Sequence, residues 1–418
     1  MLSQSISPLL LLIALVVLVG HVQQFKVPQN GGYVPRMEPG AADFAWTFSA
    51  TQALKNGENP YTHTNQEYFD PYGRFNYVGN KKQHVGYLPT HLLLYLPLAF
   101  VTDYWMEAAN YFLLFNLLLI VLLAWVTTRL VQKLGADQRV SHMLPMLILS
   151  LGLFNGTLFA FERGQSDLVT ATLIWGGILL FLSERYAAAG LVLFGAAALK
   201  GYGALLWGVI LIASIPGGAW RRYLVGSSIA FMCCLAPVIY LLPDALELMT
   251  NMVGSDAVTV NPLAYSFRNL SRALDADYIA TVALLGASFA VVLVLASVFF
   301  GRVKELRLGA QGDLATAVVI LTTCAVILPL GASNAAYTYS LVIILPGFVI
   351  LGLAYEQQWQ NAGKYGFSEL FMFFWIALIV ALAFKLNIRG ISSAAIANLL
   401  FIPFAIVAAS RDLSHQRR

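Results

Sequence analysis

Charged residues are scarce in this chain. Asp, Glu, Lys and Arg make up 11% of its 418 residues, whereas 59% of the residues are hydrophobic. A soluble globular protein carries roughly a quarter charged residues, so the composition argues against that class. The 25 basic and 21 acidic residues leave a net charge of +4 and form no polybasic block. A nucleic-acid partner is therefore not expected.

Cysteine pairs and nucleotide-binding motifs are also lacking. The three cysteines, Cys233, Cys234 and Cys324, all lie inside apolar runs and have no metal-ligand spacing. This pattern predicts neither a disulfide framework nor a metal site. The chain has no P-loop and no dinucleotide fingerprint, so no nucleotide substrate is indicated.

Long apolar runs are what the chain has in abundance. They predict an all-α polytopic membrane protein of about twelve transmembrane helices, with residues 1–418 as a single transmembrane domain. The first run lacks a basic leader and a small-residue cleavage site, so we expect a retained span rather than a signal peptide. The runs fall at about 7–21, 108–128, 142–160, 166–182, 187–200, 202–215, 223–242, 278–300, 314–331, 337–354, 368–385 and 391–409.

Basic residues are distributed unevenly between the connections. If the N-terminus is cytoplasmic, thirteen basic residues fall on the cytoplasmic side, against only Arg163, Lys200, Lys385 and Arg389 in the short connections opposite. The positive-inside rule then predicts that both termini are cytoplasmic. The scheme leaves two long outer loops, at about 23–107 and 243–277.

This orientation requires that one apolar stretch, residues 87–100, does not cross the membrane. The stretch contains Pro89 and Pro97 and is short for a span. We expect a helix or a re-entrant segment at the outer membrane face, with an ordinary short span as the alternative.

Polar residues cluster where the chain leaves the membrane. "FERGQSDL" (161–168) brings Arg163, Gln165 and Asp167 into one short connection on the outer side. Charges at membrane depth are costly unless paired or hydrated, so such a cluster predicts a functional site. A solvated turn with a Glu162–Arg163 pair is the plainer interpretation.

Two further stretches carry cations on the same side. "AALKGYGALLW" (197–207) places Lys200 before glycines that would bend the backbone, although a snorkelling lysine is the alternative. "NPLAYSFRNLSRAL" (261–274) places Arg268 and Arg272 on one helix face. Such cations can hold a phosphate at headgroup level, and an acid beside them can accept a proton from a nucleophile.

Four stretches in order resemble the GT-C glycosyltransferases, specifically family 87, over about residues 40–350. They are "ADFAWTFSATQALKNGENPY", "YLPTHLLLYLPLAF", "RGQSD" with "LKGY" downstream, and "YSFRNLSRAL". Three positions depart from the pattern: Asp167 replaces the usual Asn, Leu88 a second Pro, and Gly203 a frequent Pro. These departures leave the fold in place and the exact donor and acceptor open.

The resemblance implies a GT-C fold whose first outer loop carries juxtamembrane helices and the catalytic acid. By resemblance Asp43 is that acid, and the sequence places it just ahead of a helical run, where it could instead cap the helix. Arg163, Lys200, Arg268 and Arg272 would bind the donor phosphate. The remaining candidates for substrate binding are Gln165, Asp167, Tyr87, His91, Tyr202, Trp46 and Tyr61.

The expected reaction is transfer of one sugar, with mannose favoured, from a polyprenyl-phosphate donor to a hydroxyl by inversion. The acceptor would be a glycolipid, a polysaccharide or a protein at the outer face of a bacterial cytoplasmic membrane. No cofactor is required by this chemistry, and the question of a divalent metal stays open.

Three other functions are compatible with parts of the pattern. A transporter or flippase suits twelve spans, but the polar groups gather on one face and no inverted repeat is evident. An O-antigen ligase or polymerase would carry its large loop late in the chain, whereas here it comes early. A membrane scaffold gives no reason for Asp43, Arg163 and Lys200.

Overall fold

The structure is a computed structural model that describes residues 2–23, 42–62, 87–133, 140–201, 203–215, 217–247, 342–343, 345–347, 350, 387–388 and 391–392. The described part is almost entirely helical. Its helices are α1 (Leu2–Val22), α2 (Ala42–Lys55), α4 (Pro89–Val101), α5 (Trp105–Lys133), α6 (Val140–Leu153), α7 (Asn155–Arg163), α8 (Asp167–Leu182), α9 (Tyr186–Lys200), α10 (Gly203–Ser214) and α11 (Trp220–Ala230). Two-residue strands, β1 (Asn387–Ile388) and β2 (Ile391–Ser392), pair antiparallel.

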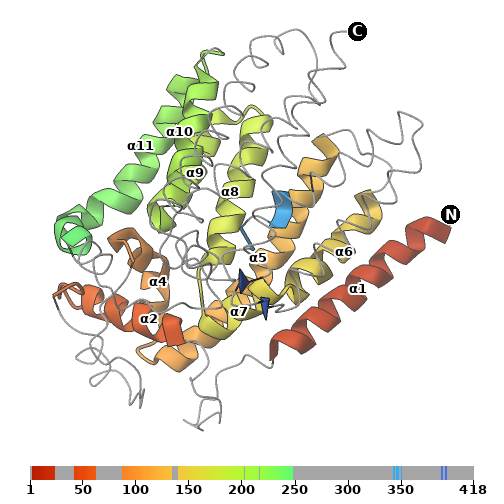
Figure 1. Ribbon diagram of the computed structural model, residues 1–418, viewed down its shortest axis with the longest axis horizontal. Helices are drawn as coiled ribbons and strands as arrows, with labels where there is room; N and C mark the ends of the chain where they lie inside the picture. Colours follow the sequence, from red (N-terminus) through yellow and green to blue (C-terminus); the bar gives the residue numbers. More distant parts are fainter. Residues whose placement is uncertain are drawn as a thin grey trace.

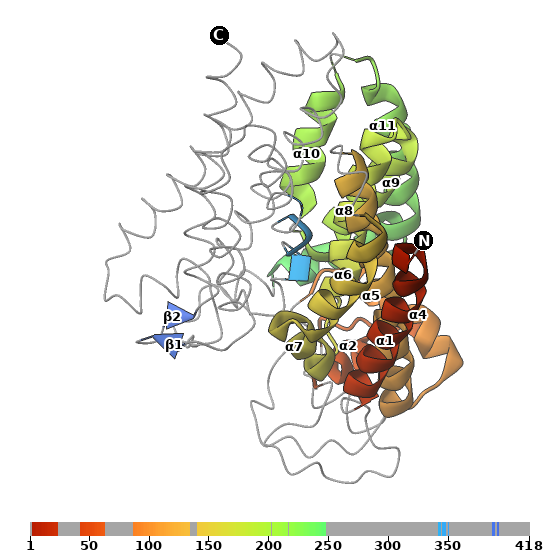
Figure 2. The ribbon, with the colours of Figure 1, turned by 90° about the vertical axis from the view of Figure 1, so that its right-hand side faces the viewer.

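The short helices α2, α4 and α7 gather at one end of the bundle (Figures 1 and 2). The helices α5 and α8 both begin at that end and run away from it side by side, so they are parallel neighbours (Figure 1). We call the end that holds α2, α4 and α7 the loop end, and the other end of α8 the distal end.

Left-handed glycines fix where two helices stop at the loop end. Gly164 follows α7 with φ 68°, and Gly201 follows α9 with φ 65°. A side chain is disfavoured at such φ values, which makes glycine the usual residue after a helix C-terminus. These turns leave Arg163 and Lys200 in the last turns of their helices, as the sequence indicated for Lys200.

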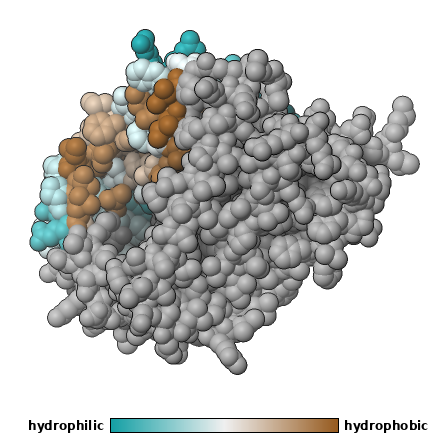
Figure 3. All heavy atoms as spheres, turned by 45° about the horizontal axis from the view of Figure 1, so that its top comes forward, coloured by the Kyte–Doolittle hydropathy of each residue, from teal (hydrophilic) through white to brown (hydrophobic). Residues whose placement is uncertain are grey.

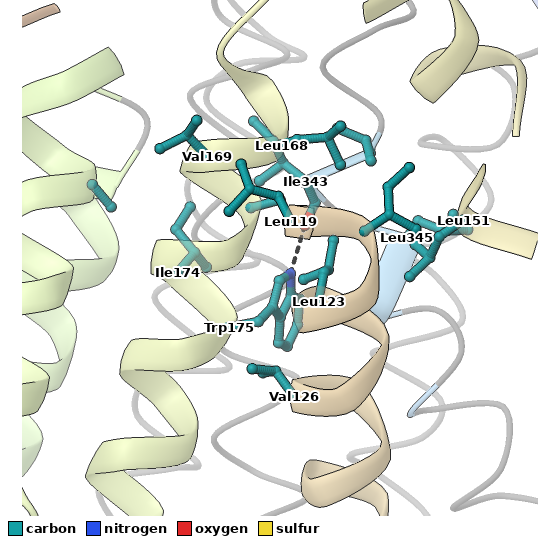
Figure 4. Close-up of a cluster of buried hydrophobic side chains, with 14 of the residues drawn as sticks. Leu119, Leu123, Val126, Leu151, Leu168, Val169, Ile174, Trp175, Ile343 and Leu345 are labelled. Atoms are coloured by element: carbon teal, nitrogen blue, oxygen red, sulfur yellow. Dashed lines mark hydrogen bonds between the residues drawn. The ribbon is translucent and has the colours of Figure 1, made fainter. Parts of the chain in front are cut away.

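The main core lies between α5, α6 and α8 (Figure 4). Trp175 of α8 is fully buried there, and its indole nitrogen donates a 2.7 Å hydrogen bond to the Ile343 carbonyl oxygen. Leu119 and Leu123 of α5 pack around it (Figure 4). A buried indole that keeps its hydrogen bond adds large apolar contact without stranding a polar group.

Helices α9 and α11 approach closely because glycine lies at both contact points. A Cβ at Gly190 would collide with the Tyr223 carbonyl oxygen, and one at Gly226 would collide with the Ala187 carbonyl oxygen. Small residues of this kind allow helix backbones to touch, as they do in membrane bundles. The pair α9–α11 is therefore held by backbone contact.

Two helices in the described part are long and apolar enough to cross a membrane, Trp105–Lys133 and Trp220–Glu247. Large apolar side chains are exposed on several helices, including Leu118 (64%), Val16 (62%) and Met232 (63%). Where the described surface is visible in Figure 3, apolar side chains form a band with hydrophilic side chains at its two ends. Exposed apolar area on this scale favours a lipid environment over water.

The expected runs up to residue 247 correspond to helices, with two corrections. The run 142–160 is not one helix: it breaks at Phe154, which has extended ψ (130°) between α6 and α7. The run 223–242 changes from α-helix to π-helix at Phe231–Leu235 and to 3₁₀-helix at Ala236–Leu241, where Pro237 cannot donate to an α-helical hydrogen bond.

Other expectations extend beyond the described residues. The number of about twelve spans depends on runs after 247, and it stays a prediction. The second outer loop, 243–277, is described only at its start. Helix α4 has 13 residues, about 20 Å at the α-helical rise, which is shorter than a hydrocarbon core of about 30 Å. This length suits a non-crossing segment.

Candidate active site

Asp43 lies in the first turn of α2, as its second residue. The sequence placed it just ahead of the helix, so the helix begins slightly earlier than expected. Its side chain is 12% exposed. A carboxylate at a helix N-terminus is favoured by the unpaired N–H groups there. The hydrogen bonds of its two carboxylate oxygens, however, go to Arg163 of α7 and to Gln165 in the turn that follows it.

Arg163 meets the Asp43 carboxylate with two parallel hydrogen bonds. Its Nε donates to Asp43 Oδ2 at 3.0 Å, and its Nη2 donates to Oδ1 at 2.7 Å. The two residues are 120 positions apart in the chain. A bidentate arginine fixes the plane of a carboxylate as well as neutralising it. The pairing that the structure gives Arg163 is thus with a distant acid, and not the turn-forming pair with Glu162.

Gln165 connects the two charged pairs of the site. Its amide nitrogen donates to Asp43 Oδ2 and, at 3.1 Å, to the Tyr87 hydroxyl. Its amide oxygen accepts a 3.2 Å hydrogen bond from Lys200 Nζ. The left-handed turn at Gly164 brings this side chain between α2 and α9. One amide thereby orients an acid on one side and a cation on the other.

Lys200 and Asp167 form the second pair, deeper than the first. Lys200 Nζ lies 2.6 Å from Asp167 Oδ2, with side-chain exposures of 5% and 0%. Asp167 Oδ1 is buried without a hydrogen-bond partner among the residues that the structure describes. A buried acceptor left unpaired is costly, so this oxygen is a cost that the site carries. With Asp43 ionised, the charges of Asp43, Arg163, Asp167 and Lys200 sum to zero.

An aromatic column covers the site from the side of α4. The rings of Tyr87 and His91 stack at 4.2 Å and 11°, and His91 lies 5.4 Å from Tyr95. Lys200 Nζ lies 5.7 Å from the centre of the Tyr87 ring. The sequence analysis did not include Tyr95 among its candidates. Its signal was the spacing of 91 and 95, which puts His91 and Tyr95 on one face of α4, whereas Tyr87 precedes the helix.

Burial shifts the pKa values of two residues of this site, Asp43 and His91. Desolvation raises the pKa of Asp43 to about 6, although the Gln165 hydrogen bond and the Lys200 charge oppose the shift. Desolvation also lowers the pKa of His91 to about 3, and the nearby Lys200 charge acts in the same direction. At neutral pH, Asp43 is therefore an ionised base of raised basicity and His91 is uncharged.

The remaining predicted residues lie around this centre or outside the described part. The Tyr61 hydroxyl donates a 2.8 Å hydrogen bond to the Tyr87 carbonyl oxygen, so it helps to position the backbone of Tyr87. Trp46 is partly buried and packs against the main core. Tyr202, Arg268 and Arg272 lie outside the residues that the structure describes.

No cluster of three or more His, Cys, Asp or Glu side chains suited to a metal occurs among the described residues. The arrangement that is present combines a buried carboxylate of raised pKa with an arginine, a lysine and stacked rings. A carboxylate of this kind can accept a proton from a hydroxyl, and the cations can stabilise negative charge on a leaving group. Group transfer to a hydroxyl is the chemistry that these groups suit.

Comparison with known families agrees with this chemistry. The family model of glycosyltransferase family 87 matches residues 86–329. The match includes Tyr87, Arg163 and Lys200 and begins after Asp43. No curated protein matches the chain.

Proposed function

Because the chain belongs to glycosyltransferase family 87, we propose that it transfers one sugar, with mannose favoured, from a polyprenyl phosphate to a hydroxyl. The acceptor is a glycolipid, a polysaccharide or a protein. Family membership makes the protein a glycosyltransferase, and its apolar helices indicate membrane association. The donor, the sugar and the acceptor are the proposed part.

The observation that carries the proposal is the arrangement around Asp43. Its carboxylate is largely buried, is oriented by Arg163 and Gln165, and has a pKa raised to about 6. A general base works best when its pKa is close to the working pH. Asp167 is the other acid of this site, but its side chain is 0% exposed, whereas the Asp43 side chain keeps 12% exposure and is the more accessible to an acceptor hydroxyl. We therefore assign the base to Asp43.

The proposed reaction is a single displacement. Asp43 takes the proton of the acceptor hydroxyl while the hydroxyl oxygen forms a bond to the anomeric carbon of the donor sugar. The bond between that carbon and the phosphate oxygen breaks, and the polyprenyl phosphate leaves with the bonding electron pair. One displacement inverts the anomeric centre. The Tyr87–His91 stack would pack against a sugar face.

The donor phosphate needs positive charge beyond what Asp43 and Asp167 neutralise. Arg163 and Lys200 lie next to the acids, and the four charges cancel, so binding an anionic donor calls for more cations. Arg268 and Arg272, from the second outer loop, are the candidates for this role. Arg163 and Lys200 would then share their hydrogen bonds between the acids and the phosphate.

The site is proposed to face the outer side of a bacterial cytoplasmic membrane, with both termini in the cytoplasm. In this arrangement residues 1–418 form one transmembrane domain. The outer loops 23–107 and 243–277 would then flank the site from two sides. The support is the uneven distribution of basic residues and the shortness of α4.

The decisive experiment incubates the purified chain with radiolabelled polyprenyl-phosphate sugars and a membrane extract, and identifies the labelled product. Nucleotide sugars serve as the matched donor control. Transfer from a polyprenyl phosphate alone, lost in Asp43→Asn, is the expected result. Transfer from a nucleotide sugar, or transport of the lipid-linked sugar without transfer, would contradict the proposal.

A further inference from the structure

A groove opens between α5, α8 and the start of α9 at the distal end. It encloses about 620 Å³. Its mouth is cationic: Arg129, Lys133 and Arg185 line it, and all three are exposed. Its inner part is apolar, with Leu122 and Leu173 among the lining residues. The groove thus changes from charged to apolar along its length.

The change from charged to apolar lining runs in the same direction along α5 and α8, and over a similar length. On α5 the lining runs from Lys133 inward to Leu122, and along parallel α8 it runs from Ser183, directly after the helix, inward to Thr172. Each stretch is about 16 Å long at the α-helical rise. One leaflet of a bilayer has a hydrocarbon depth of about 15 Å. The groove therefore matches one leaflet, with its cations where headgroups lie.

The guanidinium group of Arg129, at the mouth of the groove, contacts two side chains of its own helix. Arg129 Nη1 donates a 2.9 Å hydrogen bond to Gln132 Oε1, and the guanidinium carbon lies 5.6 Å from the centre of the Trp125 ring. A guanidinium that is oriented in advance loses less freedom when it binds an oxyanion. Basic pockets between membrane helices suit phosphate headgroups.

This groove is separate from the candidate active site. Asp167, at the first turn of α8, belongs to that site, while Arg185 follows the last turn of α8 and lines the groove together with Arg129 and Lys133 of α5. The 16 residues of α8 separate the two by about 24 Å. The inference below therefore does not rest on the proposed function.

We propose that this groove binds an anionic phospholipid of the distal leaflet. The phosphate contacts Arg129, Lys133 and Arg185, and an acyl chain lies between α5 and α8 along Leu122 and Leu173. Charge complementarity selects the headgroup, and the depth of the groove selects a chain of one leaflet's length. No covalent step is involved.

Gly176 offers a way to block the acyl part without disturbing the helices. It lines the groove, and a Cβ added there would meet no atom within 4 Å. Gly176→Leu would fill the space that the acyl chain needs. The neighbouring Gly177 is unsuitable for this purpose, since a Cβ there would lie 2.5 Å from Leu193 Cγ.

The test titrates the purified full-length chain in detergent with dioleoyl phosphatidylglycerol and measures bound lipid by native mass spectrometry. Dioleoyl phosphatidylcholine, dioleoylglycerol and glycerol phosphate separate the charge, the acyl chains and the free anion. We expect retention of phosphatidylglycerol over all three. Equal retention of phosphatidylcholine, or glycerol phosphate binding as tightly as the lipid, would overturn the proposal.

The matched variants are two double substitutions. Arg129→Gln with Lys133→Gln should weaken phosphatidylglycerol binding about 25-fold, at about fivefold for each cation near an anionic headgroup. Arg221→Gln with Arg222→Gln removes two basic residues of α11 and should leave binding unchanged. An equal loss in both pairs would indicate general surface attraction and overturn the site.

Gly176→Leu provides an independent test that changes no charge. It should weaken phosphatidylglycerol binding at least about tenfold, because the acyl chain loses its place while the cations remain. A thermal scan without lipid checks that the variant is folded, and Gly176→Ala is the smaller control. Unchanged lipid binding by folded Gly176→Leu would remove the acyl groove from the proposal.

Discussion

The charged side chains at the two ends of α8 differ in how deeply they are buried. At the loop end, Asp167 is fully buried and lies 2.6 Å from Lys200, itself only 5% exposed. At the distal end, Arg129, Lys133 and Arg185 are exposed around an apolar groove. Burying a charge costs several kcal/mol unless a partner offsets it, whereas an exposed cation costs little.

This contrast separates two kinds of binding. A site of buried, mutually bonded charges is built in advance and holds its groups in fixed geometry, as catalysis requires. A rim of exposed cations over an apolar groove can bind an anionic headgroup without burying its charge. Substitutions at the loop end should therefore affect turnover strongly, and those that leave a buried charge unpaired should also lower stability, whereas those at the distal end should affect only association.

The largest expected effect is on turnover in Asp43→Asn. The amide keeps the shape of the side chain but cannot accept a proton at neutral pH, so turnover should fall by about 10²–10⁴. Expression and donor binding should stay close to those of the unchanged chain. Initial rates with a labelled polyprenyl-phosphate sugar measure the effect.

Asp70→Asn is the control for this substitution, because Asp70 is another acid of the loop 23–107, which is proposed to lie on the outer side. It should retain turnover. An active Asp43→Asn together with an inactive Asp70→Asn would move the base to Asp70. Activity in both variants would mean that neither acid is the base.

The next effect is on stability, and it compares the two ends directly. Lys200→Ala leaves the buried Asp167 carboxylate without its cation, so the free energy of unfolding should fall by about 3–5 kcal/mol. Lys133→Ala, at the exposed distal end, should change it by less than about 0.5 kcal/mol. Denaturant unfolding in detergent measures both.

Adding Asp167→Asn to Lys200→Ala tests the cause of the loss. The double variant should recover part of the stability, since the uncompensated carboxylate is gone. If Lys200→Ala and Lys133→Ala lower stability equally, or the double variant is no better than the single one, the buried pair does not distinguish the loop end.

A pH profile sharpens the assignment of Asp43. Burial raises its pKa to about 6, and the base must be ionised to work, so kcat/KM should fall about tenfold for each pH unit below about 6. The Gln165 hydrogen bond favours the ionised form, so Gln165→Leu should move this limb to higher pH. A limb near pH 4, or no upward shift in Gln165→Leu, would contradict the assignment.

The substitutions with the smallest expected effect test whether the loop end and the distal end lie on opposite sides of the membrane. In a chain whose cysteines are replaced by serine, single cysteines at Glu58 and Arg185 should react with a membrane-impermeant reagent from opposite sides. Glu58 follows α2 at the loop end, and Arg185 lies at the distal end. Labelling of both positions from the same side would mean that α8 does not cross the membrane.

Much of the site could be predicted from the sequence because charge is so rare in it. Asp43, Arg163, Gln165, Asp167 and Lys200 stand out as polar residues beside apolar runs, and the structure brings all five together. Which charge meets which could not be predicted, because the Asp43–Arg163 contact spans 120 residues. Local spacing carries no information about such a contact.

The helix boundaries show the same limit at a smaller scale. Hydropathy averaged over a window joined residues 142–160 into one run, although the Asn155-Gly156 dipeptide beside the break is typical of turns. The structure separates α6 from α7 at Phe154, and the short α7 ends at Gly164. A single turn dipeptide inside an otherwise apolar stretch changes the averaged hydropathy too little to reveal the break.

The contact between α9 and α11 has a consequence for protein engineering. Exchanging helical glycines for alanine is a common way to stabilise a chain, worth about 1 kcal/mol for each exposed position. Gly190 and Gly226 must be left out of such a programme, because any side chain there would push the two backbones apart. Gly195 in α9 and Gly208 in α10 have open space around them and are the exchanges to try first.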